Sequence, residues 1–362
     1  MEIYKILVIN PGSTSTKIAV FANEESIFET TLRHGKEEIG KYPKVIDQFS
    51  FRKDLIIDTL KENNILLKSL DSVVGRGGLL KPIAGGTYLV NEQMIEDIKT
   101  SEKEHASNLG ALIAWEIAQS IKVPAFIVDP VVVDELEPIA RISGNPAFQR
   151  VSIFHALNQK AVARKAAQEL GKAYDECNII VAHIGGGVSV GAHAKGRVID
   201  VNNALDGDGP FSPERSGGVP VGSVIKLCFS GTKTQEEIYK GIVGKGGIVS
   251  YLDTNDAREV EKMIEEGNEK AQLVYEAMAY QISKEIGSCA TVLKGKIDAI
   301  VITGGIAYSK MFTDWIKERI EFLAPVLIYP GEGEMEALAL GGLRVLREEE
   351  TAKDYLNNIV KQ

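Results

Sequence analysis

Cysteine is scarce in this sequence, and its few copies form no metal or disulfide pattern. Cys177, Cys228 and Cys289 are widely separated among 362 residues, and none lies in a CxxC or Cys/His metal spacing. Sparse cysteines without a pattern are typical of proteins from a reduced compartment. The sequence therefore argues against a disulfide framework and a cysteine-based metal centre.

Long apolar runs and blocks of positive charge are missing as well. The apolar stretch 6–9 ends at Asn10 and Pro11, which makes it too short for a signal peptide or a membrane span. The 41 lysines and arginines are scattered and the formal net charge is −9, which argues against nucleic acid or an anionic membrane surface as a partner. We expect a soluble, cytoplasmic protein that binds a small ligand.

The familiar nucleotide-binding signatures are also absent. The segment 241–245 lacks the spacing of a P-loop and its following serine or threonine, and no GxGxxG motif opens a helix after a strand. The segment 206–209 resembles part of a calcium loop but lacks the other ligands, so we interpret it as a turn. Neither Walker nor Rossmann chemistry is indicated.

The patterns that are present predict an α/β fold of two lobes. A length of 362 residues with 44% hydrophobic content suits two domains. Apolar and β-prone stretches at 4–9 and 16–21 flank a polar loop, and a similar order of strand, glycine turn and two strands begins again at residue 178. We predict a structural duplication, with lobes 1–150 and 151–332 and C-terminal helices 333–362 returning to the first lobe.

Three glycine-rich turns follow buried strands in this pattern. The segment from Asn10 to Lys17 offers a flexible Gly12, several hydroxyl groups and one positive charge, which suit a polyphosphate, although an ordinary hydroxyl-rich hairpin is the alternative. The other two turns present unobstructed backbone N–H groups. The predicted phosphate- and nucleotide-binding residues of these turns are Asn10, Ser13, Ser15, Lys17, Gly185, Gly186, Gly187, Gly304 and Gly305.

The segments 9–17, 183–187 and 302–306 resemble the phosphate and adenosine motifs of the superfamily of acetate and sugar kinases, actins and heat-shock chaperones. The resemblance spans nearly the whole chain and implies two duplicated ribonuclease H-like, actin-like ATPase domains with an ATP cleft between them. Asn10 stands where sugar kinases, actins and chaperones usually carry Asp, which resembles the acetokinase family. Within that family, the segments 74–83, 152–156 and 212–217 resemble the butyrate kinases.

The resemblance implies two catalytic arginines, Arg76 and Arg215, and elementary chemistry agrees. A carboxylate is already an anionic nucleophile at neutral pH, so its phosphorylation needs cations rather than a general base. Both arginines lie in glycine-rich loops and could hold the carboxylate and the migrating phosphoryl group. A surface salt bridge is the alternative for each.

The same resemblance assigns roles to several other side chains. It implies that His155 hydrogen-bonds the phosphoryl group, with a structural histidine as the alternative. It also implies that His183 lies in the active site as a nucleotide-binding residue. Asp129 matches an active-site Asp that orients an arginine or the water shell of a metal, with a helix cap as the alternative. The remaining histidines match no motif and are expected to be solvated: His34, His105 and His193.

A magnesium ion is implied because the β and γ phosphates need bridging. We predict Asn10 and Glu334 as its outer-shell ligands, and Glu336 is the alternative to Glu334. The resemblance also implies self-association as a homodimer or a higher homo-oligomer. ATP or ADP and a short-chain carboxylate are the expected partners.

The acyl chain is inferred from departures from the acetate kinase pattern. Acetate kinases carry Asn where this chain has Gly186, and bulky valines where it has Gly77 and Gly78. We expect the missing volume beside Arg76 to admit a longer tail, with each buried methylene contributing about 0.8 kcal/mol. The favoured function is reversible phosphoryl transfer between ATP and butanoate, giving butanoyl phosphate and ADP. Isobutyrate, propionate and acetate kinases remain alternatives, as do a sugar kinase and an actin- or chaperone-like ATPase.

Overall fold

The computed structural model describes residues 2–101 and 105–360. The chain divides into two compact units, of which unit 1 is Met1–Asp134 with Gly333–Gln362 and unit 2 is Glu135–Glu332. The boundary after Asp134 lies earlier than the predicted residue 150. The reason is that residues 135–150 bond to unit 2, where Arg150 forms an ion pair with Asp200 at 2.8 Å.

Unit 1 is built around a six-stranded sheet of order β3-β2-β1-β4-β6-β5. Its strands are β1 Lys5–Pro11, β2 Ser15–Ala22, β3 Glu25–Arg33, β4 Ser72–Gly75, β5 Thr87–Leu89 and β6 Ala125–Val128. Its helices are α1 Lys36–Ile39, α2 Phe49–Glu62, α3 Glu92–Thr100, α4 Asn108–Ile121 and α13 Glu334–Leu346. Three-residue and four-residue 3₁₀ turns occur at Val45–Gln48, Leu67–Ser69 and Leu356–Asn358.

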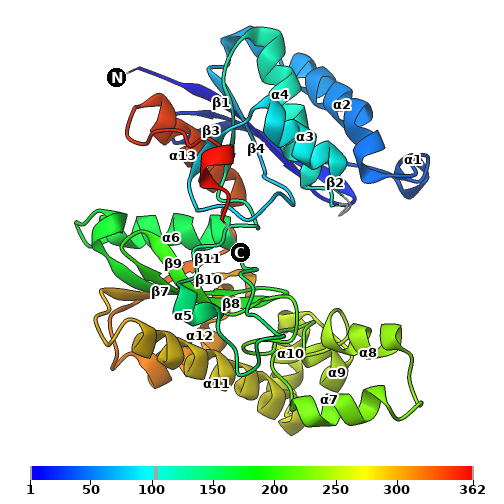
Figure 1. Cartoon of the computed structure of the whole chain (residues 1–362), viewed down its shortest axis with the longest axis vertical. Helices are drawn as coiled ribbons and strands as arrows, with labels where there is room; N and C mark the ends of the chain where they lie inside the picture. The colour runs from blue at the N-terminus through cyan, green and yellow to red at the C-terminus, as the bar shows by residue number, and fades with distance from the viewer. Residues whose placement is uncertain (1, 102–104, 361–362) are drawn as a thin grey trace. The chain divides into compact units, whose positions relative to one another are not determined.

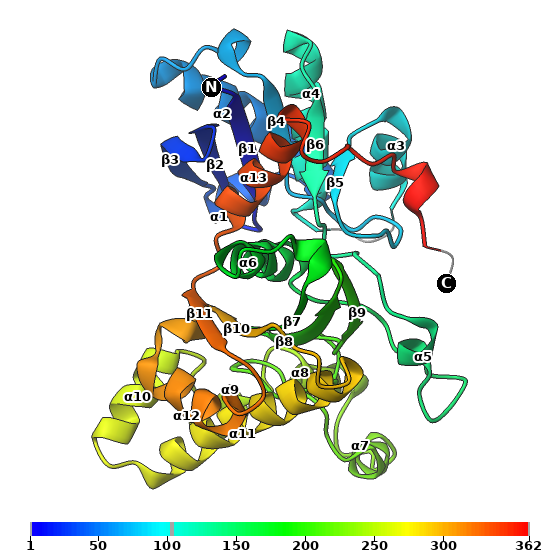
Figure 2. The ribbon, with the colours of Figure 1, turned by 90° about the vertical axis from the view of Figure 1, so that its left-hand side faces the viewer.

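Helices cover both faces of the unit 1 sheet, as the strands' apolar runs require. α2, α3 and α4 lie on one face and α13 lies on the other (Figures 1 and 2). Ile9 and Ile18 belong to the hydrophobic cluster of the α2 and α4 side. On the opposite face Gly342 of α13 lies so close to β4 that an added Cβ would stand 2.7 Å from Val74. Both central strands are therefore buried on two sides.

Unit 2 contains a five-stranded sheet of order β11-β10-β7-β8-β9. Its strands are β7 Asn178–Ile184, β8 Val188–Ala194, β9 Arg197–Val201, β10 Ala299–Gly304 and β11 Val326–Pro330. Its helices are α5 Pro138–Arg141, α6 Ala156–Glu169, α7 Val221–Cys228, α8 Gln235–Ile242, α9 Ile248–Leu252, α10 Ala257–Glu265, α11 Glu269–Val292 and α12 Lys310–Ile320. Short 3₁₀ turns occur at Tyr174–Glu176 and Gly305–Tyr308.

The unit 2 sheet is also covered on both faces, by α6 on one side and by α11 with α12 on the other (Figures 1 and 2). Ile180, Ile302 and Met278 contribute to the hydrophobic cluster on the α11 side. Among the described residues, no helix combines the length and apolar character needed to cross a membrane.

The two sheets repeat one topology, which confirms the predicted α/β fold and duplication. In unit 1, β1 pairs antiparallel with β2 and parallel with β4, and β4 pairs parallel with β6. In unit 2, β7 pairs antiparallel with β8 and parallel with β10, and β10 pairs parallel with β11. Unit 1 adds β5, which pairs antiparallel with β6 at the sheet edge.

Candidate functional site

The first predicted phosphate turn joins β1 to β2 as a hairpin. Asn10 and Lys17 face each other across the pair, and the turn is closed where Gly12 N donates to Ser15 O at 2.7 Å. Ser13 is exposed at the tip and Ser15 is half-buried. The predicted hairpin is therefore present, and the hydroxyl groups of Ser13 and Ser15 are accessible at its turn.

A buried arginine that sequence reasoning missed holds this turn from below. Arg52 on α2 is 1% exposed, and its guanidinium donates to the carbonyl oxygens of Gly12, Ser13 and Ser15 at 2.8–3.1 Å. Burial lowers the pKa of Arg52 from its ordinary value. Because the turn's carbonyls are bonded to Arg52, a positive charge lies directly beneath the predicted phosphate cradle. A lone arginine in a helical stretch gave no signal of this role.

Asn10 meets two other predicted residues at the end of β1. Asn10 Nδ2 donates to Glu334 Oε2 at 2.8 Å, and the other oxygen of Glu334 pairs with the Arg76 guanidinium. Arg76 directly follows β4, and its backbone N–H donates to Ile9 O at 2.9 Å. Glu334 lies in the first turn of α13, whereas Glu336 is exposed. The structure therefore brings Asn10, Arg76 and Glu334 together and leaves Glu336 apart.

The donor set at Glu334 allows a test of the implied magnesium ion. In the described part of the chain, no group of three or more His, Cys, Asp or Glu side chains is arranged to hold a metal ion. Magnesium beside a nucleotide keeps several waters and takes most other ligands from phosphates, so one carboxylate and one amide oxygen suit an outer shell. The hydrogen bond from Asn10 Nδ2 turns that amide's oxygen away from Glu334. Asn10 and Glu334 thus fit a water-mediated ion and do not form a complete cage.

Lys17 and Asp129 have other partners. Lys17 forms an ion pair with Glu29 at 2.9 Å across β2 and β3, with both side chains about two-fifths exposed. Asp129 is 2% exposed and has a left-handed backbone conformation, with φ of 36°. Its Oδ1 accepts from Gly86 N at 2.7 Å, which holds the glycine-rich loop that begins at Arg76. Asp129 caps no helix, because a turn follows it.

In unit 2, two of the predicted glycine turns line one cavity of about 690 Å³. The cavity volume lies within the range of small-molecule and cofactor sites. Its lining residues are Gly185, Gly186, Pro213, Glu214, Asn255, Asp256, Ala257, Arg258, Glu261, Gly305, Ile306, Tyr308, Ser309 and Glu332. Both turns stand at the ends of buried strands, β7 and β10, as predicted.

The glycines of these turns serve two different purposes. An added Cβ at Gly305 would meet no atom within 4 Å, and one at Gly186 would reach only Glu214 Oε2 at 3.7 Å. By contrast, Gly304 has φ of 93° and packs against the backbone of Ile184, and a Cβ at Gly187 would overlap the Arg215 guanidinium. Gly304 is therefore required by the backbone and Gly187 makes room for the Arg215 guanidinium, whereas Gly186 and Gly305 leave open space toward the cavity.

Arg215 lies beside the second turn. Its guanidinium packs on Gly187 and donates to Ala204 O, while Ser212 Oγ donates to Gly186 O at 2.6 Å. The pKa of Arg215 is lowered from its ordinary value because the side chain is buried. The charge of the neighbouring Glu214 opposes this effect but is the smaller of the two causes. The structure thus places this predicted cation within the loop that supports the second predicted phosphate turn.

An acidic and basic pair at the start of α10 also lines the cavity and was missed. Arg258 Nε and Nη2 donate to the two oxygens of Asp256 at 2.9 and 2.6 Å. The hydrogen bond from the Arg258 side chain lowers the pKa of Asp256 to about 2. The sequence signal was an Asp at a helix N-cap, which predicts a helix start rather than a ligand contact.

The predicted histidines His155 and His183 stack on each other. Their ring centroids lie 3.8 Å apart with an interplanar angle of 12°. His155 is at the N-cap of α6, and its Nδ1 lies 2.8 Å from Ser189 Oγ. His183 is on β7, and its Nδ1 lies 2.7 Å from Asn158 Oδ1. The two rings are brought together by one helix and one strand beside the glycine turn.

Two further sequence expectations were wrong, one about histidines and one about glycines. His34 and His193 were expected to be solvated but are buried, at 6% and 0% exposure. His34 is hydrogen-bonded to Thr16, and His193 is hydrogen-bonded to Gln159 and Tyr174, so protein partners replace water around both rings. The isolated histidines carried no sequence signal of these partners.

The second error concerns the glycines beside Arg76, which do not leave room for an acyl tail. A Cβ at Gly77 would stand 2.6 Å from Pro130 Cβ, and one at Gly78 would stand 2.6 Å from Asn108 Cα. The volume beside Arg76 is filled by Pro130 and Asn108, so these glycines leave no free space for a longer acyl tail.

Comparisons with known proteins give one family match and several structures of similar fold. Residues 148–324 match the model of the acetokinase family. The structure is similar to Porphyromonas gingivalis acetate kinase, with 20% identity, a TM-score of 0.77 and coverage of 95% of this chain and 100% of that one. A propionate kinase from Francisella tularensis gives 20% identity, a TM-score of 0.70 and coverage of 93% and 98%. Entamoeba histolytica acetate kinase has 17% identity and a TM-score of 0.76, and the match covers 95% of this chain and 100% of that one.

Proposed function

We propose that this chain, whose residues 148–324 carry the acetokinase family pattern, is an ATP-dependent kinase of a short-chain carboxylate. The observation that carries the proposal is the unit 2 cavity, into which Gly186 and Gly305 face with open space. Glycines that neither packing nor backbone conformation requires are explained by close approach of a ligand.

The nucleotide fits this cavity in parts. The backbone N–H groups of the Gly185 turn would receive phosphate oxygens, and the Gly305 turn would receive the nucleoside. Asp256 carries a lowered pKa and is an acceptor suited to ribose hydroxyl groups. The exposed Arg258 guanidinium, held by Asp256, presents a flat surface for a base.

The acceptor is proposed to be a carboxylate. An alcohol acceptor needs a general base, and Asn10 cannot act as one. The carboxamide of Asn10 has no charge, and it already donates to Glu334. A carboxylate needs only positioning and charge neutralisation, for which Arg76 and Arg215 carry guanidinium groups in their two loops. His155 would donate a hydrogen bond to the transferring phosphoryl group.

A magnesium ion bound with the nucleotide would neutralise charge on its phosphates. Asn10 and Glu334 are proposed to hold the water shell of that ion. Asp129 is proposed to act indirectly. Its carboxylate accepts a hydrogen bond from Gly86 N and so holds the loop that begins at Arg76.

Butyrate is the acid that we propose, on the likeness of the segments 74–83, 152–156 and 212–217 to butyrate kinases. Acetate and propionate are the alternatives, since structures of similar fold are described as kinases of those acids. A homodimer or higher homo-oligomer is proposed on the same likeness, and light scattering would measure the association. A cytoplasmic location is proposed on the scarcity and spacing of the cysteines.

The test is to trap acyl phosphate with hydroxylamine in reactions that contain ATP, magnesium and one of acetate, propionate, butyrate or isobutyrate. We expect the highest kcat/KM with butyrate. A preference for acetate or propionate would reject the butyrate assignment and keep the kinase. ATP turnover with hexoses, or without any acceptor, would reject the carboxylate kinase.

A further inference from the structure

The unit 2 helix α6 buries three consecutive polar side chains, of which Gln159 has no part in the proposed chemistry so far. Gln159 is 0% exposed and extends toward β8, where Ser189 and His193 are also 0% exposed. A buried polar side chain is costly unless it is hydrogen-bonded. The partners of Gln159 therefore indicate what it does.

The orientation of the Gln159 amide is fixed by a backbone carbonyl. Gln159 Nε2 lies 3.0 Å from Ser189 O, which can only accept, and 2.8 Å from Ser189 Oγ. The nitrogen must therefore face Ser189, and the amide oxygen faces His193 Nε2 at 3.0 Å. Because that oxygen can only accept, His193 carries its proton on Nε2.

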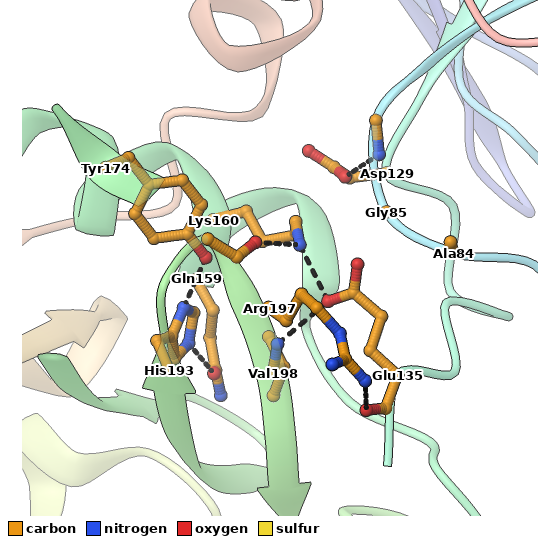
Figure 3. A network of polar contacts seen from close by, with 12 residues as sticks. Ala84, Gly85, Asp129, Glu135, Gln159, Lys160, Tyr174, His193, Arg197 and Val198 are labelled. Atoms are coloured by element: carbon orange, nitrogen blue, oxygen red, sulfur yellow. Dashed lines mark hydrogen bonds and ion pairs between the residues drawn. The ribbon is translucent and has the colours of Figure 1, made fainter. Parts of the chain in front are cut away.

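His193 completes a consistent set of donors. With its proton on Nε2, its Nδ1 accepts from the Tyr174 hydroxyl at 2.7 Å (Figure 3). Burial, and then the charge of Lys160, lower the pKa of His193 to about 3, so the ring is neutral at neutral pH. Lys160 itself is paired with Glu135 at 2.8 Å.

The hydroxyl of Ser189 links the Gln159 amide to the His155 ring by hydrogen bonds. Ser189 Oγ accepts from Gln159 Nε2, and the backbone N–H of His155 also points to it at 3.5 Å. Of the partners recorded for Ser189 Oγ among the described residues, only His155 Nδ1, at 2.8 Å, can accept its proton. The Ser189 hydroxyl therefore donates to Nδ1, and neutral His155 carries its proton on Nε2.

We propose that Gln159 and Ser189 are positioning residues that fix His155 in the Nε2–H tautomer. The tautomer follows from the hydrogen bonds alone, whereas its use in phosphoryl transfer rests on the proposed function. A proton on Nε2 makes that nitrogen a donor to an anionic oxygen, and the bonded Nδ1 is unavailable for that purpose. Sequence reasoning identified His155 but not the two residues that order its protons.

The experiment measures the tautomer directly by ¹⁵N NMR of protein labelled in its histidine rings. The His155 signals are assigned by comparison with His155→Asn, under conditions where the ring is neutral. In the unchanged protein we expect a protonated Nε2 and an unprotonated Nδ1. A protonated Nδ1 would overturn the proposal, and this reading does not depend on catalytic activity.

Three variants test which groups fix the tautomer. Ser189→Ala removes the hydroxyl donor, and Gln159→Met removes the amide that orients it, so both are expected to give a mixture of His155 tautomers. Ser283→Ala is the matched control, because Ser283 is also buried in unit 2 but bonds to Ala279 O within α11. An unchanged tautomer in either test variant would overturn the role of the residue replaced.

Kinetics then separate positioning from structure. Loss of one hydrogen bond to His155 is expected to lower kcat about tenfold in Ser189→Ala, with KM for ATP within about twofold of the original value. Ser283→Ala should keep both constants. If the tautomer shifts while kcat stays, His155 does not act in transfer and the proposed function of that residue fails, but the positioning role stands.

Discussion

Asn10 Nδ2 donates to Glu334 Oε2 over 2.8 Å, although the two residues are 324 positions apart in the sequence. The contact joins the end of the first strand to the first turn of α13, the last α-helix of the described chain. The same carboxylate pairs with Arg76. The Glu334 carboxylate therefore orients two groups. These are the Asn10 amide, which we assign to the metal, and the Arg76 guanidinium, which we assign to the substrate.

Replacing Glu334 by Gln should lower kcat by about tenfold or more, because hydrogen bonds to charged groups typically contribute about 1.5–3 kcal/mol. The magnesium concentration for half-maximal activity should rise. The control is Glu336→Gln, which changes an exposed side chain in the same helical turn. Equal effects of the two substitutions on kcat would contradict the role of Glu334.

The two glycines of the third turn should respond differently to alanine. Gly304→Ala should lower the free energy of unfolding by about 1–3 kcal/mol, because it places a Cβ at φ of 93° against Ile184. Gly305→Ala should leave the melting temperature unchanged, since its Cβ meets open space. Calorimetry with ATP should show about tenfold weaker binding to Gly305→Ala, as the methyl group occupies the cavity. Unchanged ATP binding would mean that the nucleotide lies elsewhere.

The arginines are expected to act on turnover more than on nucleotide affinity. Arg76→Ala and Arg215→Ala should each lower kcat by about 10²–10³, which is typical when a group that stabilises transition-state charge is removed. The dissociation constant for ATP should change only severalfold. Arg319→Ala is the control, since Arg319 forms an exposed pair with Glu276 at 3.4 Å. Parallel losses in kcat and ATP affinity would indicate a role in binding alone.

Much of the fold was predictable because it depends on short-range patterns. The hairpin around Asn10 and the strands after residue 178 both follow from apolar periodicity and turn residues. The roles of Arg52 and Gln159 were not predictable, because each depends on partners supplied by a distant strand or turn. The error at Gly77 has the same origin, since Pro130 fills the space beside it.

The packing at these glycines leads to a prediction about acid preference. Gly77→Ala and Gly78→Ala should lower the free energy of unfolding by about 1–3 kcal/mol through overpacking, and the order of preference among the four acids should stay the same. Gly144→Ala, whose Cβ would meet no atom within 4 Å, is the control for stability. If Gly77→Ala remained fully stable and shifted its preference toward acetate, the space beside Arg76 would determine chain length after all.

Buried His193 should make the stability of the chain depend on acid. Its pKa is about 3 in the folded state, where burial and Lys160 disfavour the charged ring, against an ordinary value of 6.5. The unfolded chain therefore takes up this proton first, so the stabilisation is complete above about pH 6.5 and is lost as the pH falls toward 3.

Urea unfolding at about pH 7 and about pH 4.5 should show this loss, worth roughly 2–3 kcal/mol between the two conditions. The variant His193→Gln keeps a polar side chain but cannot be protonated, so its stability should fall by correspondingly less over the same interval. Its lower stability at pH 7, from imperfect bonds to Gln159 and Tyr174, does not enter this comparison. An equal fall in both proteins would show that His193 is not the group whose protonation destabilises the folded state.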